Sequence, residues 1–117
     1  MRIDIKGTQL DLTPSLKTFI NQKIGPVGKL LSRFERDGEL TLFFEVARTT
    51  KHHRHGDVFY AEAMLTFPGG QTIRIEENDA DARVAIDRVR DRLKFEVKKL
   101  KDRKSERIVR LRKNART

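Results

Sequence analysis

Apolar and polar residues follow two different periods along this chain. Alternation, which predicts a strand, occurs in the first six residues, from Leu40 to Val46, from Val58 to Phe67 and from Thr72 to Glu76. Steps of three and four residues, which predict amphipathic helices, run from Leu16 to Phe34 and from Ala82 to Leu100. The predicted order is therefore β-α-β-β-β-α, an α+β fold in which the last three strands form an antiparallel meander.

Glycine, proline and capping residues predict where the first elements begin and end. Gly7 is expected to end the first strand. Thr13 is expected to cap the first helix, and Pro14 to begin it, because a proline at the first helical position loses no hydrogen bond. Gly25-Pro26 predicts a kink or a division into two short helices, since proline removes an intrahelical bond and clashes with the preceding turn.

The last helix is expected to begin after a cap at Asn78 or Asp79. Its apolar stripe thins beyond Leu100, so the helix either continues to about Arg112 as a solvated extension or frays after Lys104. A chain of 117 residues is long enough for one domain with one modest core of sheet packed on helices. We assign residues 1–104 to this domain and residues 105–117 to a basic helical extension or tail.

Two aromatic residues, Phe43 and Phe95, lie off the apolar stripes of their elements. An exposed aromatic ring can stack on a nucleic-acid base. Partial burial beside the core is the commoner outcome, however, and is the one expected for both residues.

Almost all of the net positive charge lies in the last third of the chain. Residues 79–117 contain 15 lysines and arginines against 7 acidic residues, which accounts for +8 of the total net charge of +9. A basic helix attached to a nearly neutral domain most often meets a polyanion, and nucleic acid is the usual one.

The cations of the last helix have the spacing of a phosphate-binding face. Four follow one another at steps of four, seven and four: Arg88, Arg92, Lys99 and Arg103. Three flank this line: Lys94, Lys98 and Lys101. Several cations at helical spacing suit a phosphate backbone, because each contact releases condensed counterions. The alternative is a solvated face balanced by acids such as Asp87, Asp91 and Glu96, but this segment has too few acids to balance it.

The segment from Lys51 to His55 contains three histidines in a predicted loop. Neighbouring histidines in an extended loop point in different directions, and no carboxylate or cysteine lies at metal-ligand spacing, so a metal site is disfavoured. Contact with phosphates or bases is the favoured interpretation, and a solvated loop is the alternative.

Several classes of function lack support in the sequence. The chain contains no cysteine, which excludes disulfides and thiolate sites and fits a cytoplasmic protein. There is no signal-peptide pattern and no apolar run of membrane-spanning length. Nucleophile and phosphate-loop motifs are missing as well, so we expect neither an enzyme, nor a cofactor or small-molecule substrate.

Three groups of residues, each weak alone, occur together in a specific order. The first is Leu-Thr-Pro-x-Leu at residues 12–16. The second is His-His-Arg-His-Gly-Asp-Val-Phe at residues 52–59, and the third is Asp-Ala-Arg-Val-Ala-Ile-Asp at residues 81–87 with Lys-Lys-Leu-Lys at 98–101. Together they resemble the ribosome hibernation-promoting factor family, also called ribosome-associated inhibitors or ribosomal subunit interface proteins, in its short form.

The resemblance implies a four-stranded sheet with two helices on one face, similar to double-stranded RNA-binding domains. It also implies a monomer that binds the small ribosomal subunit and its rRNA in the channel for mRNA and tRNA. Such binding silences and protects idle ribosomes under stress. The family's basic contacts, carried over by position, fall on Lys17, Lys23, Lys29, Arg48, His53, Arg54, Arg88, Arg92, Lys98, Lys99 and Lys101.

Two positions depart from the family pattern. Arg83 stands where the family usually has an aromatic residue, and we keep it as a candidate RNA contact because it is basic. Pro26 replaces a basic residue.

Two other functions stay open for this chain. They are a general binder of structured RNA, such as a chaperone or assembly factor, and a protein-interaction module. In the latter, Ile108, Val109 and Leu111 would dock on a partner.

Overall fold

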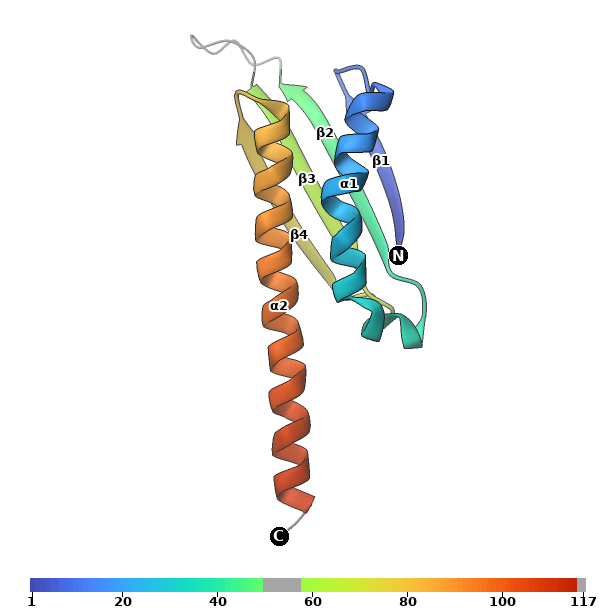
Figure 1. The fold of residues 1–117 in the computed structure, drawn as a ribbon, viewed down its shortest axis with the longest axis vertical. Helices are drawn as coiled ribbons and strands as arrows, with labels where there is room; N and C mark the ends of the chain where they lie inside the picture. Colours follow the sequence, from blue (N-terminus) through green and yellow to red (C-terminus); the bar gives the residue numbers. More distant parts are fainter. Residues whose placement is uncertain (50–57, 116–117) are drawn as a thin grey trace.

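The computed structural model describes residues 1–49 and 58–115, with the side chains of residues 36, 37 and 104–115 left out. The elements in chain order are β1 (Arg2–Thr8), α1 (Pro14–Leu30), the 3-10 helix η1 (Ser32–Asp37), β2 (Thr41–Thr49), β3 (Val58–Thr66), β4 (Thr72–Asp79) and α2 (Ala82–Ala115). This order confirms the predicted β-α-β-β-β-α arrangement (Figure 1).

The four strands form one sheet in the order β1-β2-β3-β4. The strands β2, β3 and β4 are antiparallel neighbours, which confirms the predicted meander. Strand β1 lies parallel to β2 at the edge of the sheet. A parallel pair needs a crossover connection, and α1 provides it.

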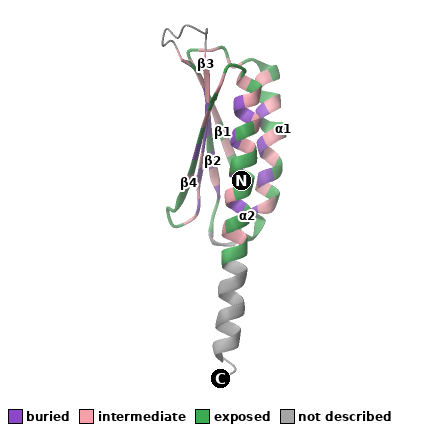
Figure 2. Cartoon of the chain, turned by 90° about the vertical axis from the view of Figure 1, so that its left-hand side faces the viewer, coloured by how far each residue is buried: buried purple, intermediate pink, exposed green. Residues whose placement is uncertain are grey.

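Both helices cover the same face of the sheet (Figures 1 and 2). Helix α1 lies over β1 and β2, whereas α2 packs on β3 and β4 and against α1. The core between these layers is formed by alternate strand residues and by one stripe of each helix. Its largest fully buried side chains are Phe44, Ile20, Ile24, Leu31, Leu40, Leu42, Leu65, Ile86 and Leu93.

Strand β1 continues through Gly7 to Thr8, so the predicted end at Gly7 is wrong. Gly7 pairs with Val46, and a Cβ atom there would lie 3.2 Å from the Leu12 Cβ and 3.3 Å from the Leu10 carbonyl oxygen. The glycine therefore allows the returning chain to pass close to the strand, rather than ending the strand.

Helix α1 begins as predicted, because the Thr13 hydroxyl accepts a hydrogen bond from the Leu16 amide at 3.2 Å. The helix then runs unbroken through Pro26, so the division into two short helices is wrong. The ring of Pro26 is exposed, while the adjoining Ile24 and Val27 are buried, and their burial offsets the lost hydrogen bond.

Helix α1 ends at Leu30, earlier than the apolar spacing predicted. The Leu31 amide donates to the Gly28 carbonyl at 3.1 Å, and the chain continues as η1. The tighter turn brings Phe34 to Phe67 in an edge-to-face contact, with ring centroids 5.5 Å apart.

The cap of α2 differs from both predicted candidates. Strand β4 extends to Asp79, and the Asp81 side chain accepts from the Arg83 amide at 2.9 Å. The Asp79 carboxylate in turn accepts from the Asp81 amide at 2.8 Å. Asp79 therefore shapes the turn that precedes the helix, and Asp81 satisfies an amide of its first turn.

Helix α2 is longer than the sheet on which it packs. Its 34 residues correspond to roughly 51 Å, whereas the longest strands have 9 residues and span about 30 Å. The helix extends beyond one end of the sheet (Figure 1). It reaches Ala115, three residues past the predicted limit at Arg112. The division into a domain of residues 1–104 and a basic extension stays a prediction.

Candidate nucleic-acid interface

The face of the sheet opposite the helices has a mixed and slightly acidic surface. Three glutamates lie side by side across it, because Glu45 pairs with Glu62, and Glu62 with Glu76, in the strand register. The charged side chains on this face are Arg2, Asp4, Lys6, Glu45, Glu62, Arg74 and Glu76. Four acids face three cations here, so this face offers no excess of positive charge to nucleic acid.

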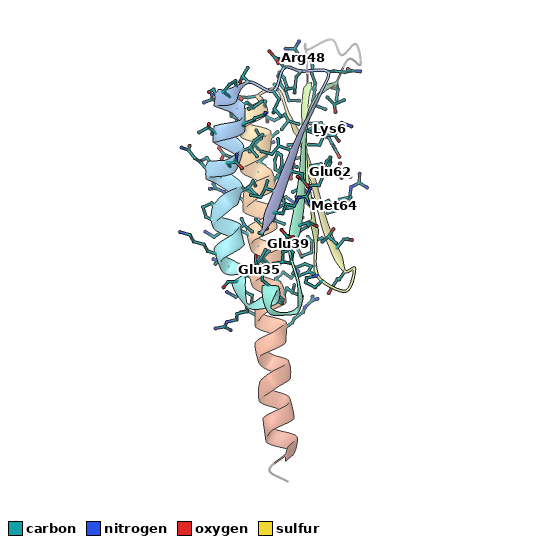
Figure 3. All side chains as sticks on the ribbon, turned by 90° about the vertical axis from the view of Figure 1, so that its right-hand side faces the viewer. Lys6, Glu35, Glu39, Arg48, Glu62 and Met64 are labelled. Atoms are coloured by element: carbon teal, nitrogen blue, oxygen red, sulfur yellow. The ribbon has the colours of Figure 1, made fainter. Side chains whose placement is uncertain are left out.

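Glu62 on this face is nearly buried and fully engaged. Its carboxylate accepts from the Tyr60 hydroxyl at 2.6 Å and from the Arg74 guanidinium at 2.6 Å. Burial raises the pKa of Glu62, but these two hydrogen bonds and the Arg74 charge outweigh burial and hold the pKa below its usual value. Figure 3 labels Glu62 and Met64 on the side of the sheet away from the helices. Each carboxylate oxygen of Glu62 thus accepts one hydrogen bond, and the cluster joins β3 to β4.

The helix side carries the excess positive charge, and α2 presents it on two flanks. The flank nearer β4 contains Arg88 and Arg92. Arg88 lies 3.2 Å from the Asp79 carboxylate, and Arg92 lies 2.8 Å from the Glu77 carboxylate. Arg92 also donates to the Glu76 carbonyl oxygen at 2.9 Å. These two predicted RNA contacts therefore also hold α2 to the sheet.

Lys99 and Arg103 continue this β4 flank. They follow Arg92 by seven and eleven residues, about two and three helical turns, and so lie on the same side of α2. Lys99 lies 3.9 Å from the Glu96 carboxylate, a distance at which half-exposed groups interact weakly. The predicted line of four cations is therefore one side of the helix, and its acidic partners come mainly from β4.

The other flank of α2 faces α1. The Arg83 guanidinium lies over the Phe19 ring, with 5.0 Å between Cζ and the ring centroid, and reaches the Ser15 hydroxyl at 3.4 Å. The Lys23 ammonium lies over the same ring, 5.4 Å from its centroid, and is 3.2 Å from the Asp87 carboxylate. Two cations from two helices thus converge on one aromatic ring at the seam between α1 and α2.

Three lysines of α2 are free to bind a partner. Lys94 and Lys101 follow Arg83 by about three and five turns, on the side of α1, and Lys98 lies between the two flanks. Within residues 1–49 and 58–103, none of the three forms an ion pair. Their charge is therefore available to phosphates without breaking an ion pair within the described residues.

The three lysines of α1 do not form one face. Lys17, Lys23 and Lys29 are spaced six residues apart, and six residues of α-helix turn the side chain to a direction about 120° away. Lys23 faces α2, while Lys17 and Lys29 are exposed in other directions. The structure brings only Lys23 together with the cations of α2.

Arg48, another predicted contact, lies at the end of the sheet where both helices begin. Arg48 near the end of β2 lies over the Phe59 ring, 5.6 Å from its centroid, and is labelled in Figure 3. From this end, the predicted contacts on α2 extend from Arg83 to Lys101, which are 18 residues or roughly 27 Å apart. His53, Arg54 and the whole segment of residues 52–55 lie outside the described residues, as do the side chains of Ile108, Val109 and Leu111.

Phe43 and Phe95 are exposed aromatic rings among the described residues, and partial burial was expected for both. Phe95 on α2 is 62% exposed, so its expected partial burial is wrong. Its position opposite the buried stripe of Leu93 and Val97 was the signal in the sequence. Phe43 on the open sheet face is 38% exposed, beside Met64 in the register.

The chemistry of the described residues is that of a binding surface. Within residues 1–49 and 58–103, no group of three or more His, Cys, Asp or Glu side chains is placed to hold a metal ion. Neither of the described α-helices carries an apolar stretch long enough to cross a membrane. Cations along a helix with an exposed aromatic among them suit a polyanion that also offers flat rings.

Two solved structures of known proteins have a similar fold. The chain resembles the N-terminal domain of Protein Y from Thermus thermophilus at 33% identity and a TM-score of 0.65, covering 86% of this chain and 99% of that domain. A ribosomal subunit interface protein from Coxiella burnetii shares the fold at 21% identity and a TM-score of 0.63, covering 87% and 99%. No curated protein sequence matches the chain.

A family model decides the identity. The model described as "Sigma 54 modulation protein / S30EA ribosomal protein" matches residues 3–105. This match and the Protein Y domain confirm the family resemblance that the sequence motifs indicated, and the second structure confirms the fold. The chain therefore belongs to the Sigma 54 modulation protein / S30EA ribosomal protein family, a family of ribosome-associated proteins.

Proposed function

We propose that this protein binds the small ribosomal subunit through its rRNA, in the channel that mRNA and tRNA occupy. Bound there, it silences idle ribosomes and protects them under stress or in stationary phase. The observation that carries the proposal is the free basic surface of α2, beside the seam with α1, in a chain of a ribosome-associated family. It acts in the cytoplasm, as a monomer off the ribosome.

The distribution of charge supports RNA as the ligand on the helix side. Lys94, Lys98 and Lys101 have no acidic partner in the described part of the chain, whereas the open sheet face carries a row of glutamates. Each lysine that meets a phosphate releases a counterion, which gives affinity without reading a sequence. Contacts of this kind suit A-form RNA, because its major groove is too deep and narrow for side chains to read the bases there.

Steric occlusion is the proposed mechanism of inhibition. A sheet covered by two helices is a rigid body, and once its helix side is held on rRNA its volume excludes mRNA and tRNA from the same space. No chemical step is needed, and the described residues offer no catalytic arrangement. Arg88 and Arg92 contribute by fixing α2 on the sheet, so that the free lysines are presented in one geometry.

Co-sedimentation with purified small subunits tests the proposal. The wild-type protein is expected to sediment with them, to compete with tRNA and to lose affinity steeply with salt. The double variant Lys98→Glu with Lys101→Glu is expected to lose binding without losing its fold, because neither lysine supports an intramolecular ion pair in the described residues.

A matched control makes the same change of charge on the other face. Arg2→Glu with Lys6→Glu alters two exposed cations of β1 on the open side of the sheet, and binding is expected to stay close to wild type. Equal loss in both doubles would show that net charge alone drives binding. Equal affinity of the wild type for free duplex RNA and for small subunits would favour a general binder of structured RNA instead.

The basic extension has a separate test. Truncation after Lys104 removes residues 105–117, which have five basic residues and one acidic one. Reduced affinity with a smaller salt slope is expected if the extension adds phosphate contacts. Unchanged ribosome binding together with loss of a protein partner would favour an interaction role for this segment.

A further inference from the structure

Phe95 is an exposed aromatic ring that the fold does not explain. It lies on the side of α2 opposite the buried residues Leu93 and Val97, and 62% of its surface is accessible. An exposed phenylalanine keeps its ring in water and contributes little to the core. A single exposed apolar side chain is common on protein surfaces, so the meaning of this ring depends on the residues that surround it.

Three cations and one acid, Asp91, are the neighbours of this ring one turn away on the helix surface. Arg92 lies one turn before Phe95, and Lys98 and Lys99 lie one turn after it, at spacings of three and four residues. The Lys99 ammonium lies over the ring, 5.4 Å from its centroid. One ring face is thus associated with a cation, and a ligand that uses Phe95 must tolerate positive charge on both sides of it.

This environment distinguishes between two kinds of ligand. The centre of a protein interface is depleted in lysine, because desolvating an ammonium is costly. A nucleotide instead offers a flat base for the ring and phosphates for the adjoining cations. The base must be unpaired, since bases within a duplex are already stacked on their neighbours.

Phe43 provides the contrast within the same molecule. It is the other exposed large apolar side chain of the described residues, but it lies between Asp4 and Met64 in the register of the open sheet face. The neighbouring row of that face carries three glutamates. Its surroundings also include Arg74 in the same row as Phe43, so acids and cations are nearly balanced around it, and it serves as the control for exposure without an excess of positive charge.

We propose that Phe95 stacks on an unpaired base of the bound RNA, while Arg92, Lys98 and Lys99 hold the adjoining phosphates. The proposal deepens the proposed function and rests on it for the identity of the RNA on the ribosome. Phe95 thus places α2 at a single-stranded or bulged nucleotide, a position that phosphate contacts alone do not select.

A tryptophan reporter tests stacking directly. The chain contains no tryptophan and one tyrosine, so Phe95→Trp introduces a single tryptophan on the proposed surface. Its fluorescence is expected to be quenched on addition of small ribosomal subunits, and also on addition of a mixed-sequence single-stranded oligoribonucleotide. Phe43→Trp, on the open sheet face, is expected to keep its emission in both titrations.

A second variant measures what the ring contributes. Phe95→Leu keeps an apolar side chain but removes the aromatic face, and should weaken binding to small subunits by about 5- to 150-fold, the range for loss of one stacked base. The salt dependence should stay unchanged, because no phosphate contact is lost. Lys98→Ala is the matched comparison, since it should reduce the salt slope by about one unit.

The outcomes separate this inference from the proposed function. If small subunits bind the wild type, but the emission of Phe95→Trp is unchanged with both ligands and Phe95→Leu binds normally, stacking is wrong and ribosome binding stands. A blue shift without quenching, together with normal binding of Phe95→Leu, shows coverage by protein and also overturns stacking. Quenching by the oligoribonucleotide without any binding to small subunits supports stacking and overturns the ribosomal target.

Discussion

Arg92 of α2 forms an ion pair with Glu77 of β4 at 2.8 Å, and the same guanidinium nitrogen donates to the carbonyl oxygen of Glu76 at 2.9 Å. A residue whose spacing marks it as an RNA contact therefore also joins the long helix to the edge strand. The Arg92 side chain is 55% exposed, so it can still meet a phosphate. Stability and binding are coupled at this position.

The first prediction separates these two roles of Arg92. Arg92→Ala is expected to lower the free energy of unfolding by about 1 kcal/mol, since it removes a half-exposed ion pair and a hydrogen bond to the backbone. Lys98→Ala is expected to leave stability unchanged, as Lys98 has no ion pair in the described part of the chain. Urea unfolding measures both. Equal midpoints for the two variants would mean that the Arg92 contacts do not hold the helix.

The fold was largely predictable, because strong periodicity and local capping signals agree with each other. The alternation around Phe44 and the stripe through Leu93 both follow the buried residues of the structure. The errors occur where tertiary contacts override local preference. Gly7 continues a strand because the chain returns close beside it, and Pro26 stays within a helix whose other side is buried.

The surface was less predictable, because charge in a sequence carries no information about partners in space. Spacing correctly places Arg88 and Arg92 on one side of α2, but the acids that pair with them belong to another element, Asp79 and Glu77 of β4. Phe95 was misjudged for a related reason. The commoner fate of an off-stripe aromatic is partial burial, and no neighbouring element covers this one.

The second prediction concerns the proline inside α1. Pro26→Ala restores an amide that can donate to the preceding turn and removes the clash of the ring. It should therefore stabilise the protein by about 1–3 kcal/mol. Gly25→Ala is the comparison: a Cβ there meets nothing within 4 Å, so a smaller gain of about 0.5–1 kcal/mol is expected. Thermal unfolding measures the stability of both variants. A lower melting temperature for Pro26→Ala would contradict the expectation that the proline destabilises the helix at this position.

The third prediction tests the seam between the two helices. Arg83 lies over the Phe19 ring at 5.0 Å, so a double-mutant cycle with Arg83→Gln and Phe19→Leu should give a coupling of about 0.5–1 kcal/mol. A cycle of Lys17→Gln with Phe19→Leu is the control. Residues two apart on a helix do not face each other, so its coupling should be close to zero. Equal couplings would show that Arg83 and Phe19 do not interact specifically.

The fourth prediction concerns the stability of the sheet in acid. The hydrogen bonds of Tyr60 and Arg74 overcome burial and hold the pKa of Glu62 below its usual value of 4.5. Since the folded pKa lies below the unfolded one, the contribution of this carboxylate to stability is complete above pH 4.5. It is lost as the pH falls through the lower folded value. The free energy of unfolding should therefore decline below pH 4.5, in part through Glu62.

Two variants isolate this contribution of Glu62. Glu62→Gln has the same shape but does not titrate, so its stability should decline less steeply in acid than that of the wild type. Tyr60→Phe removes one of the hydrogen bonds that lower the pKa of Glu62, so its acid-dependent loss of stability should be smaller and should be complete at a higher pH than in the wild type. Denaturant unfolding at a series of pH values measures all three proteins. Parallel curves for wild type and Glu62→Gln would contradict a contribution of Glu62 to the acid sensitivity of the fold.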